Sequence, residues 1–161
     1  MRKVKIYLAF GIIMTLIGIT SVSAQLPDFR IASIDSTYYG VKYINKKDPV
    51  LFMYFSPSCE ECSEMTSAIL NKIGDLKNTQ IVMITNESLI EVRKFIMHYG
   101  INEHKNIIIG TEGHTYRFAK NFQIGKLPFL VFYNNKAKLI MTYNNATPAK
   151  DFVSDVLKSS N

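Results

Sequence analysis

The chain has 161 residues, a length that fits one domain and leaves little room for a second. Hydrophobic residues make up 47% of it and charged residues 20%, which excludes a disordered chain and allows a buried core. The formal net charge is +6, but no dense block of lysine and arginine stands among aromatic residues, so nothing indicates a nucleic-acid partner.

The first 24 residues are predicted to be a secretory signal peptide that does not belong to the fold. A basic start precedes an apolar run over 6–19, and Val22-Ser23-Ala24 offers small residues for cleavage. We therefore expect an exported protein, periplasmic or secreted, whose domain spans 25–161. The alternative is a membrane anchor formed by an uncleaved N-terminal segment, although the apolar run is short beside the ~20 residues that a span requires.

Apolar and amphipathic segments alternate along the rest of the chain. Segment 26–49 is predicted to contain a short strand around Phe29 and Ile31. The pair Tyr38-Tyr39 is either a partner-binding patch or part of the core, and the core is favoured. The pattern then predicts, in chain order, a strand (50–55), a helix between Ser58 and Gly74, a strand (80–85), a helix (87–99), a strand (107–109), a short helix (115–122), a hairpin (129–133 and 138–143) and a last helix (148–158). This order predicts an α/β fold, a central mixed sheet with helices on both faces.

The limits of the first helix are predicted from its capping residues. Ser58 is expected to be the N-cap, and Glu61 three residues later completes a capping box. Within the helix Cys62, Met65 and Ile69 share one apolar face, and Gly74 is expected to end the helix.

Both cysteines of the chain, Cys59 and Cys62, lie where the strand is predicted to meet this helix. A disulfide between them closes so small a loop that it removes little entropy from the unfolded chain, which favours redox chemistry over a structural role. Cys59 at the helix N-terminus is expected to have a lowered pKa and to attack, whereas Cys62 faces the core and resolves the mixed disulfide. Glu60 and Glu61 are expected to oppose the thiolate, although acids in a first turn also stabilise a helix.

The segments "LFMYFSPSCEEC" and, some 65 residues later, "IGKLPFLVFYNNKAKLI" together resemble the thioredoxin fold, in particular its exported TlpA/ResA-like thiol–disulfide oxidoreductases. The resemblance covers most of 26–158, including the opening "LPDF". It implies that Pro128 is cis and packs beside the cysteines, and that Leu127 and Pro128 contact the substrate. The chain departs from the family by having no tryptophan before Cys59 and Met53 where thioredoxins carry a buried aspartate.

The sequence therefore predicts an enzyme, an exported thiol–disulfide oxidoreductase that uses no cofactor and leans toward reduction. Its partners are expected to be protein thiols and disulfides and an unidentified electron-donor or acceptor protein, which could lie in the membrane. One alternative is a thioredoxin-fold binding module without turnover, which Met53 favours. A metal site formed by the cysteines with His98, His104 or His114 is less favoured on ligand count, and covalent haem is excluded because Ser63 follows Cys62.

Overall fold

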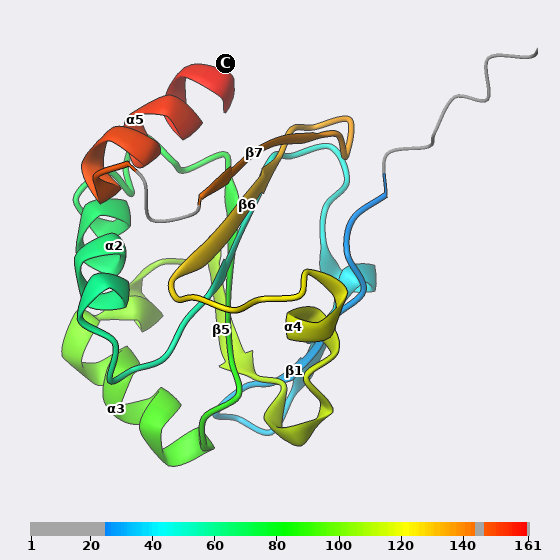
Figure 1. Cartoon of the computed structure of the whole chain (residues 1–161), viewed down its shortest axis with the longest axis vertical. Coiled ribbons are helices and arrows are strands. Elements are labelled where there is room, and N and C mark those ends of the chain that lie inside the picture. Colours follow the sequence, from blue (N-terminus) through cyan, green and yellow to red (C-terminus); the bar gives the residue numbers. More distant parts are fainter. Residues whose placement is uncertain (1–24, 144–146, 161) are drawn as a thin grey trace, which may run out of the picture.

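The computed structural model describes residues 25–143 and 147–160, so the predicted signal segment lies outside the described residues (Figure 1). A seven-stranded sheet has the order β2-β1-β5-β4-β3-β6-β7. The strands are β1 (Arg30–Ala32), β2 (Tyr38–Gly40), β3 (Val50–Tyr54), β4 (Gln80–Thr85), β5 (Ile107–Thr111), β6 (Phe129–Tyr133) and β7 (Leu139–Tyr143). Strands β3, β4 and β5 are parallel, whereas β6, β7, β1 and β2 join antiparallel, so the predicted mixed sheet is confirmed.

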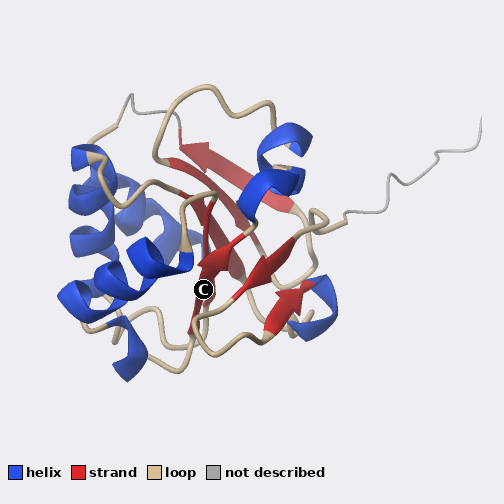
Figure 2. Ribbon diagram, turned by 90° about the horizontal axis from the view of Figure 1, so that it is seen from below, coloured by secondary structure: helices blue, strands red, loops and turns tan. Residues whose placement is uncertain are grey.

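Helices cover both faces of this sheet, as predicted. Figure 1 shows α2, α3 and α5 on one side and α4 on the other, and the second view agrees (Figure 2). The helices are α2 (Glu60–Leu70), α3 (Leu89–Tyr99), α4 (Arg117–Asn121) and α5 (Ala149–Ser160), with short 3-10 helices η1 (Val41–Tyr43), η2 (Ile101–Glu103) and η3 (Gly113–Thr115). None of the described helices is both long enough and apolar enough to cross a membrane.

Two apolar clusters form the core, one on each face of the sheet. Successive side chains of a strand point to opposite faces, so Leu51 and Met53 of β3 enter the cluster under α2, α3 and α5, while Phe52 and Tyr54 enter the cluster under α4. All five residues of β3 are buried because both faces are covered. The unbroken apolar run in the sequence is explained by this burial.

Three details of the predicted elements are wrong. Helix α2 ends at Leu70, and Gly74 does not end it, since the chain continues from Asn71 through successive turns. Strand β2 was not predicted, since its three residues gain their pairing only from β1. Tyr38 of this strand is 54% exposed, and not part of the core, because β2 is an edge of the sheet.

Candidate active site

Strand β3 delivers the chain to the edge of the sheet where the cysteines lie. The N–H of Phe55 donates to the carbonyl of Ile84 on β4, and a turn then joins the N–H of Cys59 to the carbonyl of Ser56 at 3.1 Å. Helix α2 begins directly after this turn. The local sequence therefore places Cys59 at the first position where helical N–H groups lack partners of their own.

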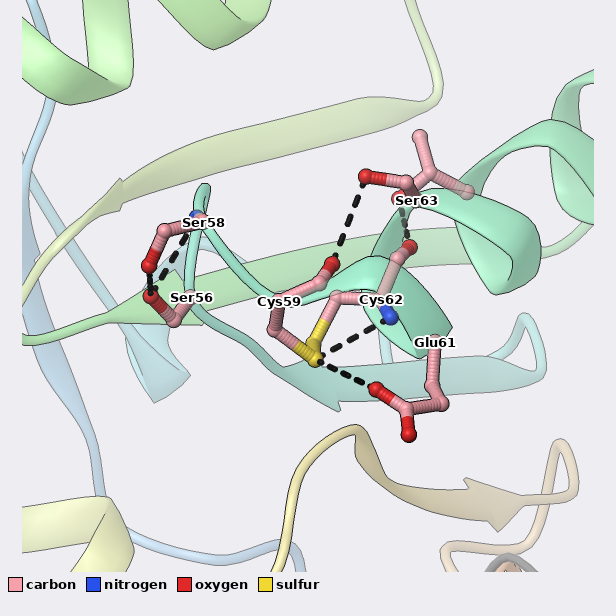
Figure 3. The surroundings of a disulfide bond; sticks show 7 residues. Ser56, Ser58, Cys59, Glu61, Cys62 and Ser63 are labelled. Atoms are coloured by element: carbon pink, nitrogen blue, oxygen red, sulfur yellow. Dashed lines mark hydrogen bonds between the residues drawn. A yellow bond between two sulfur atoms is a disulfide. The ribbon is translucent and has the colours of Figure 1, made fainter.

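Cys59 and Cys62 form a disulfide across the first turn of α2 (Figure 3). The sulfur of Cys59 also accepts a hydrogen bond from the backbone N–H of Cys62 at 3.2 Å, so Cys59 is itself the N-cap of the helix. Cys62 is fully buried against Met65, whereas Cys59 is partly exposed. The two sulfurs thus differ in access and in backbone support, in the direction that their predicted roles require.

The predicted capping box is wrong. Ser58 lies before the helix, and its hydroxyl is 3.1 Å from that of Ser56 within the preceding turn (Figure 3). Because the turn ends one residue later than expected, the cap position falls on Cys59 and a sulfur replaces the serine oxygen. Ser63 contacts the same cap residue, because its hydroxyl donates a hydrogen bond to the carbonyl of Cys59 at 3.3 Å.

Glu61 and Glu60 are not equivalent in the structure. The carboxylate of Glu61 points back to Cys59, with Oε2 3.8 Å from Sγ (Figure 3). A disulfide sulfur carries no hydrogen, so this contact can become a hydrogen bond only when Cys59 is reduced to a thiol. Glu60 is an exposed residue of the same first turn. Of the two acids, Glu61 is therefore the one placed to act on the sulfur.

The Leu127–Pro128 peptide bond is cis, as the resemblance implied. Phe129 of β6 pairs with Tyr54 of β3, which sets Pro128 at the end of the sheet from which the chain runs to Cys59. Leu127 packs against the apolar cluster that contains both cysteines. The structure therefore brings the predicted substrate-contacting segment to the same edge as the disulfide.

Met53 is fully buried in the apolar cluster that contains Cys62, so a thioether occupies the position where thioredoxins carry an aspartate. The polar contact beside Cys62 comes instead from Thr66, whose hydroxyl donates to the Cys62 carbonyl at 2.7 Å. This bond engages the backbone and leaves the Cys62 sulfur without a contribution from that hydroxyl. Proton transfer at Cys62 must use a different route from the one that a buried aspartate provides.

Sequence reasoning missed Tyr143, which lies close to this region. Burial, followed by the negative charges of Glu64 and Glu61, raises the pKa of Tyr143. The same residue lines a cavity of about 130 Å³ together with Pro128 and Phe129. A tyrosine at the end of a predicted hairpin carries no sequence signal for this placement, because only the pairing of β7 with β6, which sets Tyr143 opposite Leu130, creates it.

A second cavity flanks the cysteines on the side of α3. It has a volume of about 370 Å³ and is lined by Pro57, Ser63, Glu91, Lys94, Phe95, His98 and Tyr99. His98 stands in the last turn of α3, where a cation suits the helix dipole. No group of three or more potential metal ligands occurs within residues 25–143 and 147–160.

No family model matches the chain, and no curated protein matches it by sequence. Solved structures do match. A secreted Mycobacterium tuberculosis disulfide oxidoreductase, homologous to Escherichia coli DsbE, has a TM-score of 0.68 at 15% identity, over 81% of this chain and 95% of that one. A putative Bacteroides thetaiotaomicron protein disulfide isomerase has a TM-score of 0.65 at 20% identity, over 88% of this chain and 89% of that one. An exposed lipoprotein thioredoxin of Streptococcus pneumoniae has a TM-score of 0.60 at 15% identity, over 82% of this chain and 98% of that one.

Identities at this level show a shared fold, which is also the fold that the strand order and the cis proline describe. The protein has a thioredoxin-like fold, with its two cysteines joined at the N-terminus of the helix that follows the central strand.

Proposed function

We propose that the protein is an exported thiol–disulfide oxidoreductase that exchanges electrons with protein thiols and leans toward reduction. The observation that carries the proposal is the Cys59–Cys62 disulfide at a helix N-terminus, with one sulfur accessible and the other buried. Solved structures of the same fold include a disulfide oxidoreductase described as secreted and an exposed lipoprotein thioredoxin, which supports the exported setting.

The proposed reduction proceeds in two exchanges. The Cys59 thiolate attacks a substrate disulfide, forms a mixed disulfide, and releases one substrate thiolate that takes up a proton. The Cys62 thiolate then attacks the Cys59 sulfur, and the second substrate thiolate leaves and is protonated. Two electrons pass to the substrate, and the protein is left with the intramolecular disulfide seen here. A reducing partner protein must restore the dithiol.

The environment of Cys59 supports the proposed direction. The N–H of Cys62 favours a thiolate on Cys59, while the Glu61 carboxylate at 3.8 Å opposes it. A less stable thiolate makes the reduced form of the protein less favoured. The couple is therefore a weaker oxidant than it would be with two neutral residues between the cysteines. Glu60 and Glu61 are thus proposed to tune the redox couple, and Leu127 with Pro128 to contact the substrate.

Insulin reduction in the presence of dithiothreitol tests the proposal. The wild-type protein is expected to accelerate precipitation of the insulin B chain, and Cys59→Ser is expected to abolish that acceleration. A Ser58→Ala variant is the matched control, since it alters the adjacent residue and leaves both sulfurs in place. A wild-type protein that does not accelerate the reaction contradicts the enzymatic role.

A binding module without turnover is the second candidate, and Met53 favours it. A thioether cannot accept the proton of Cys62, which slows resolution of any mixed disulfide. A module would retain exported partner proteins while showing no insulin reductase activity, so the same assay separates the two functions.

A further inference from the structure

Glu112 is the one charged residue among those described that is buried, with 5% of its surface exposed. It follows β5 directly, and its N–H donates to the carbonyl of Thr85 on β4 at 2.8 Å. Burying a carboxylate is costly unless hydrogen bonds compensate for the lost water. The thiol chemistry proposed above does not use Glu112, so its burial calls for a separate explanation.

The compensating hydrogen bonds come from the first turn of α4. Oε2 of Glu112 accepts from the N–H of Phe118 at 2.8 Å, and Oε1 accepts from the N–H of Ala119 at 3.4 Å. Tyr116, the residue before the helix, provides no side-chain cap and has a left-handed backbone with φ 47°. Glu112 therefore caps α4 from outside the helix.

Such a cap matters because α4 has only five residues. A helix this short is unstable by itself, since too few hydrogen bonds form to offset the cost of ordering its first turn. The hydroxyl of Thr115 donates to the Glu112 carbonyl at 2.8 Å, which fixes the intervening loop to the same residue. The carboxylate of Glu112 therefore helps to hold the start of α4, together with the buried ring of Phe118.

Aromatic contacts lead from α4 to the segment beside the cysteines. Phe118 packs against Phe122 with ring centres 4.8 Å apart, and Phe122 packs against Phe129 at 5.3 Å. Phe129 directly follows Pro128 and pairs across the sheet with Tyr54, whose ring also stacks on Phe118 at 6.1 Å. Figure 1 shows the chain passing from α4 across the sheet to the start of β6.

We propose that Glu112 is a positioning residue for polypeptide substrates, acting through α4 and the Phe118–Phe122–Phe129 contacts on the Leu127–Pro128 segment. The inference rests on the proposed function. Glu112 lies on the α4 face of the sheet, and Cys62 lies on the opposite face, so the carboxylate acts on the segment that meets the substrate and not on the sulfurs. A small disulfide reaches Cys59 without that segment, whereas a polypeptide must also fit against it.

The experiment compares two substrates for each variant: insulin, and the small disulfide 5,5′-dithiobis(2-nitrobenzoate). Glu112→Gln keeps the shape but presents an NH2 group to one of the two N–H donors, and Glu112→Ala removes both acceptors. We expect kcat/KM for insulin to fall roughly three- to tenfold in Glu112→Gln and further in Glu112→Ala, which are modest losses of positioning. With the small disulfide both variants should stay within about twofold of wild type, and the equilibrium with glutathione should not move.

Two controls separate positioning from a general loss of stability. Glu103→Gln makes the same chemical change at an exposed site in η2, and it should leave both activities unchanged. Val153→Ala destabilises the core under α5 without touching α4, and it should lower neither activity at a temperature where circular dichroism shows a folded protein.

Four outcomes are informative. An equal loss on both substrates in folded Glu112→Gln, or a loss on insulin in Val153→Ala as large as in Glu112→Gln, overturns the positioning role. Unchanged insulin reduction in Glu112→Gln also overturns it, even if Glu112→Ala fails to fold. Wild-type protein that reduces neither substrate instead overturns the proposed function, so the two failures are distinct.

Discussion

Cys59 and Cys62 are separated by one helical turn, yet their surroundings differ in three respects. Cys59 is partly exposed, receives the N–H of Cys62 and faces the carboxylate of Glu61. Cys62 is fully buried in the apolar cluster that contains Met53. A substrate can therefore reach only one of the two sulfurs, and a base can approach the other only with difficulty.

This asymmetry predicts which cysteine can be trapped with a substrate. Cys62→Ser removes the resolving thiol, so mixed disulfides through Cys59 should accumulate. Cys59→Ser leaves a buried thiol that cannot attack, so it should trap almost nothing. Each variant is expressed in an exporting host, and its free thiols are alkylated at once. Mixed disulfides are then measured on non-reducing gels. Equal trapping by both variants would contradict the assignment of roles.

Glu61 should affect Cys59 more strongly than Glu60 does. Removing the charge at 3.8 Å in Glu61→Gln is expected to increase the acid dissociation constant of Cys59 and to make the couple more oxidising. Because the carboxylate is exposed, the increase should be no more than roughly fivefold. Thiolate absorbance against pH, paired with glutathione equilibration, measures both effects.

Glu60→Gln is the matched control, because it removes the same charge from the same helical turn. A smaller change in Glu60→Gln than in Glu61→Gln is expected. Identical changes would mean that the two acids act only as distant charges, and that the contact between Glu61 and the sulfur contributes nothing.

At the scale of elements, each end of α2 is set by its surroundings rather than by the capping residues in the sequence. Its N-cap moves to Cys59 because the turn from Ser56 ends there, and its last residue is Leu70, before the turns that include Gly74. Strands β1 and β5 approach closely at Gly110, where an added Cβ would collide with the carbonyl of Ala32. Glycine is required at this position by a neighbouring strand and not by a turn.

Gly110→Ala is therefore expected to destabilise the protein by about 1–3 kcal/mol, as other substitutions that overpack a core do. Gly74→Ala provides the matched control, since an added Cβ there meets nothing within 4 Å. It should be neutral or stabilise slightly, because alanine restricts the unfolded chain. Urea unfolding of both variants measures the difference in the free energy of unfolding. A loss of stability in Gly74→Ala would mean that a glycine is required at this position after all.

At the scale of the whole molecule, two apolar clusters enclose the sheet and bury three tyrosines. Burial raises the pKa of Tyr54, with Glu112 adding to the effect, and burial also raises the pKa of Tyr133 and Tyr143. Each of these groups keeps its proton in the folded protein at pH values where an unfolded tyrosine, with a usual pKa of 10.0, has lost it. The unfolded state then binds fewer protons than the folded state, so stability falls as pH rises.

The free energy of unfolding should thus be unaffected by these tyrosines below pH ~9 and decline above pH ~10. Tyr54→Phe removes one titrating group. The free energy of unfolding should therefore decline less steeply between about pH 9 and 11, by a slope that corresponds to up to one fewer proton released on unfolding. Urea unfolding at several pH values, fitted for the proton difference, measures the effect.

Tyr38→Phe is the control for this prediction, because it makes the same chemical change at a side chain that is 54% exposed. Its pH dependence should match that of the wild type. A decline in Tyr54→Phe as steep as in the wild type would contradict a buried, protonated Tyr54.

The sequence by itself determined the order of strands and helices from β3 onward, the hairpin, the face that α2 buries and the redox role expected of the two cysteines. Each of these follows from a local signal: the period of apolar residues, a turn residue, or the spacing of Cys59 and Cys62. Gly100 illustrates the point, since it directly follows the predicted helix 87–99 and ends α3 in a left-handed conformation. The cis bond at Pro128 came from family resemblance and not from the residues alone.

The tertiary structure decided what depends on contacts between distant segments. Edge strand β2 exists because β1 pairs with it, and Tyr143 reaches the Pro128 segment because β7 pairs with β6. Glu112 gave no sequence signal either, because its partners are backbone N–H groups, which every residue except proline carries. Only folding determines which N–H groups a buried carboxylate meets, and so only the structure shows what Glu112 holds in place.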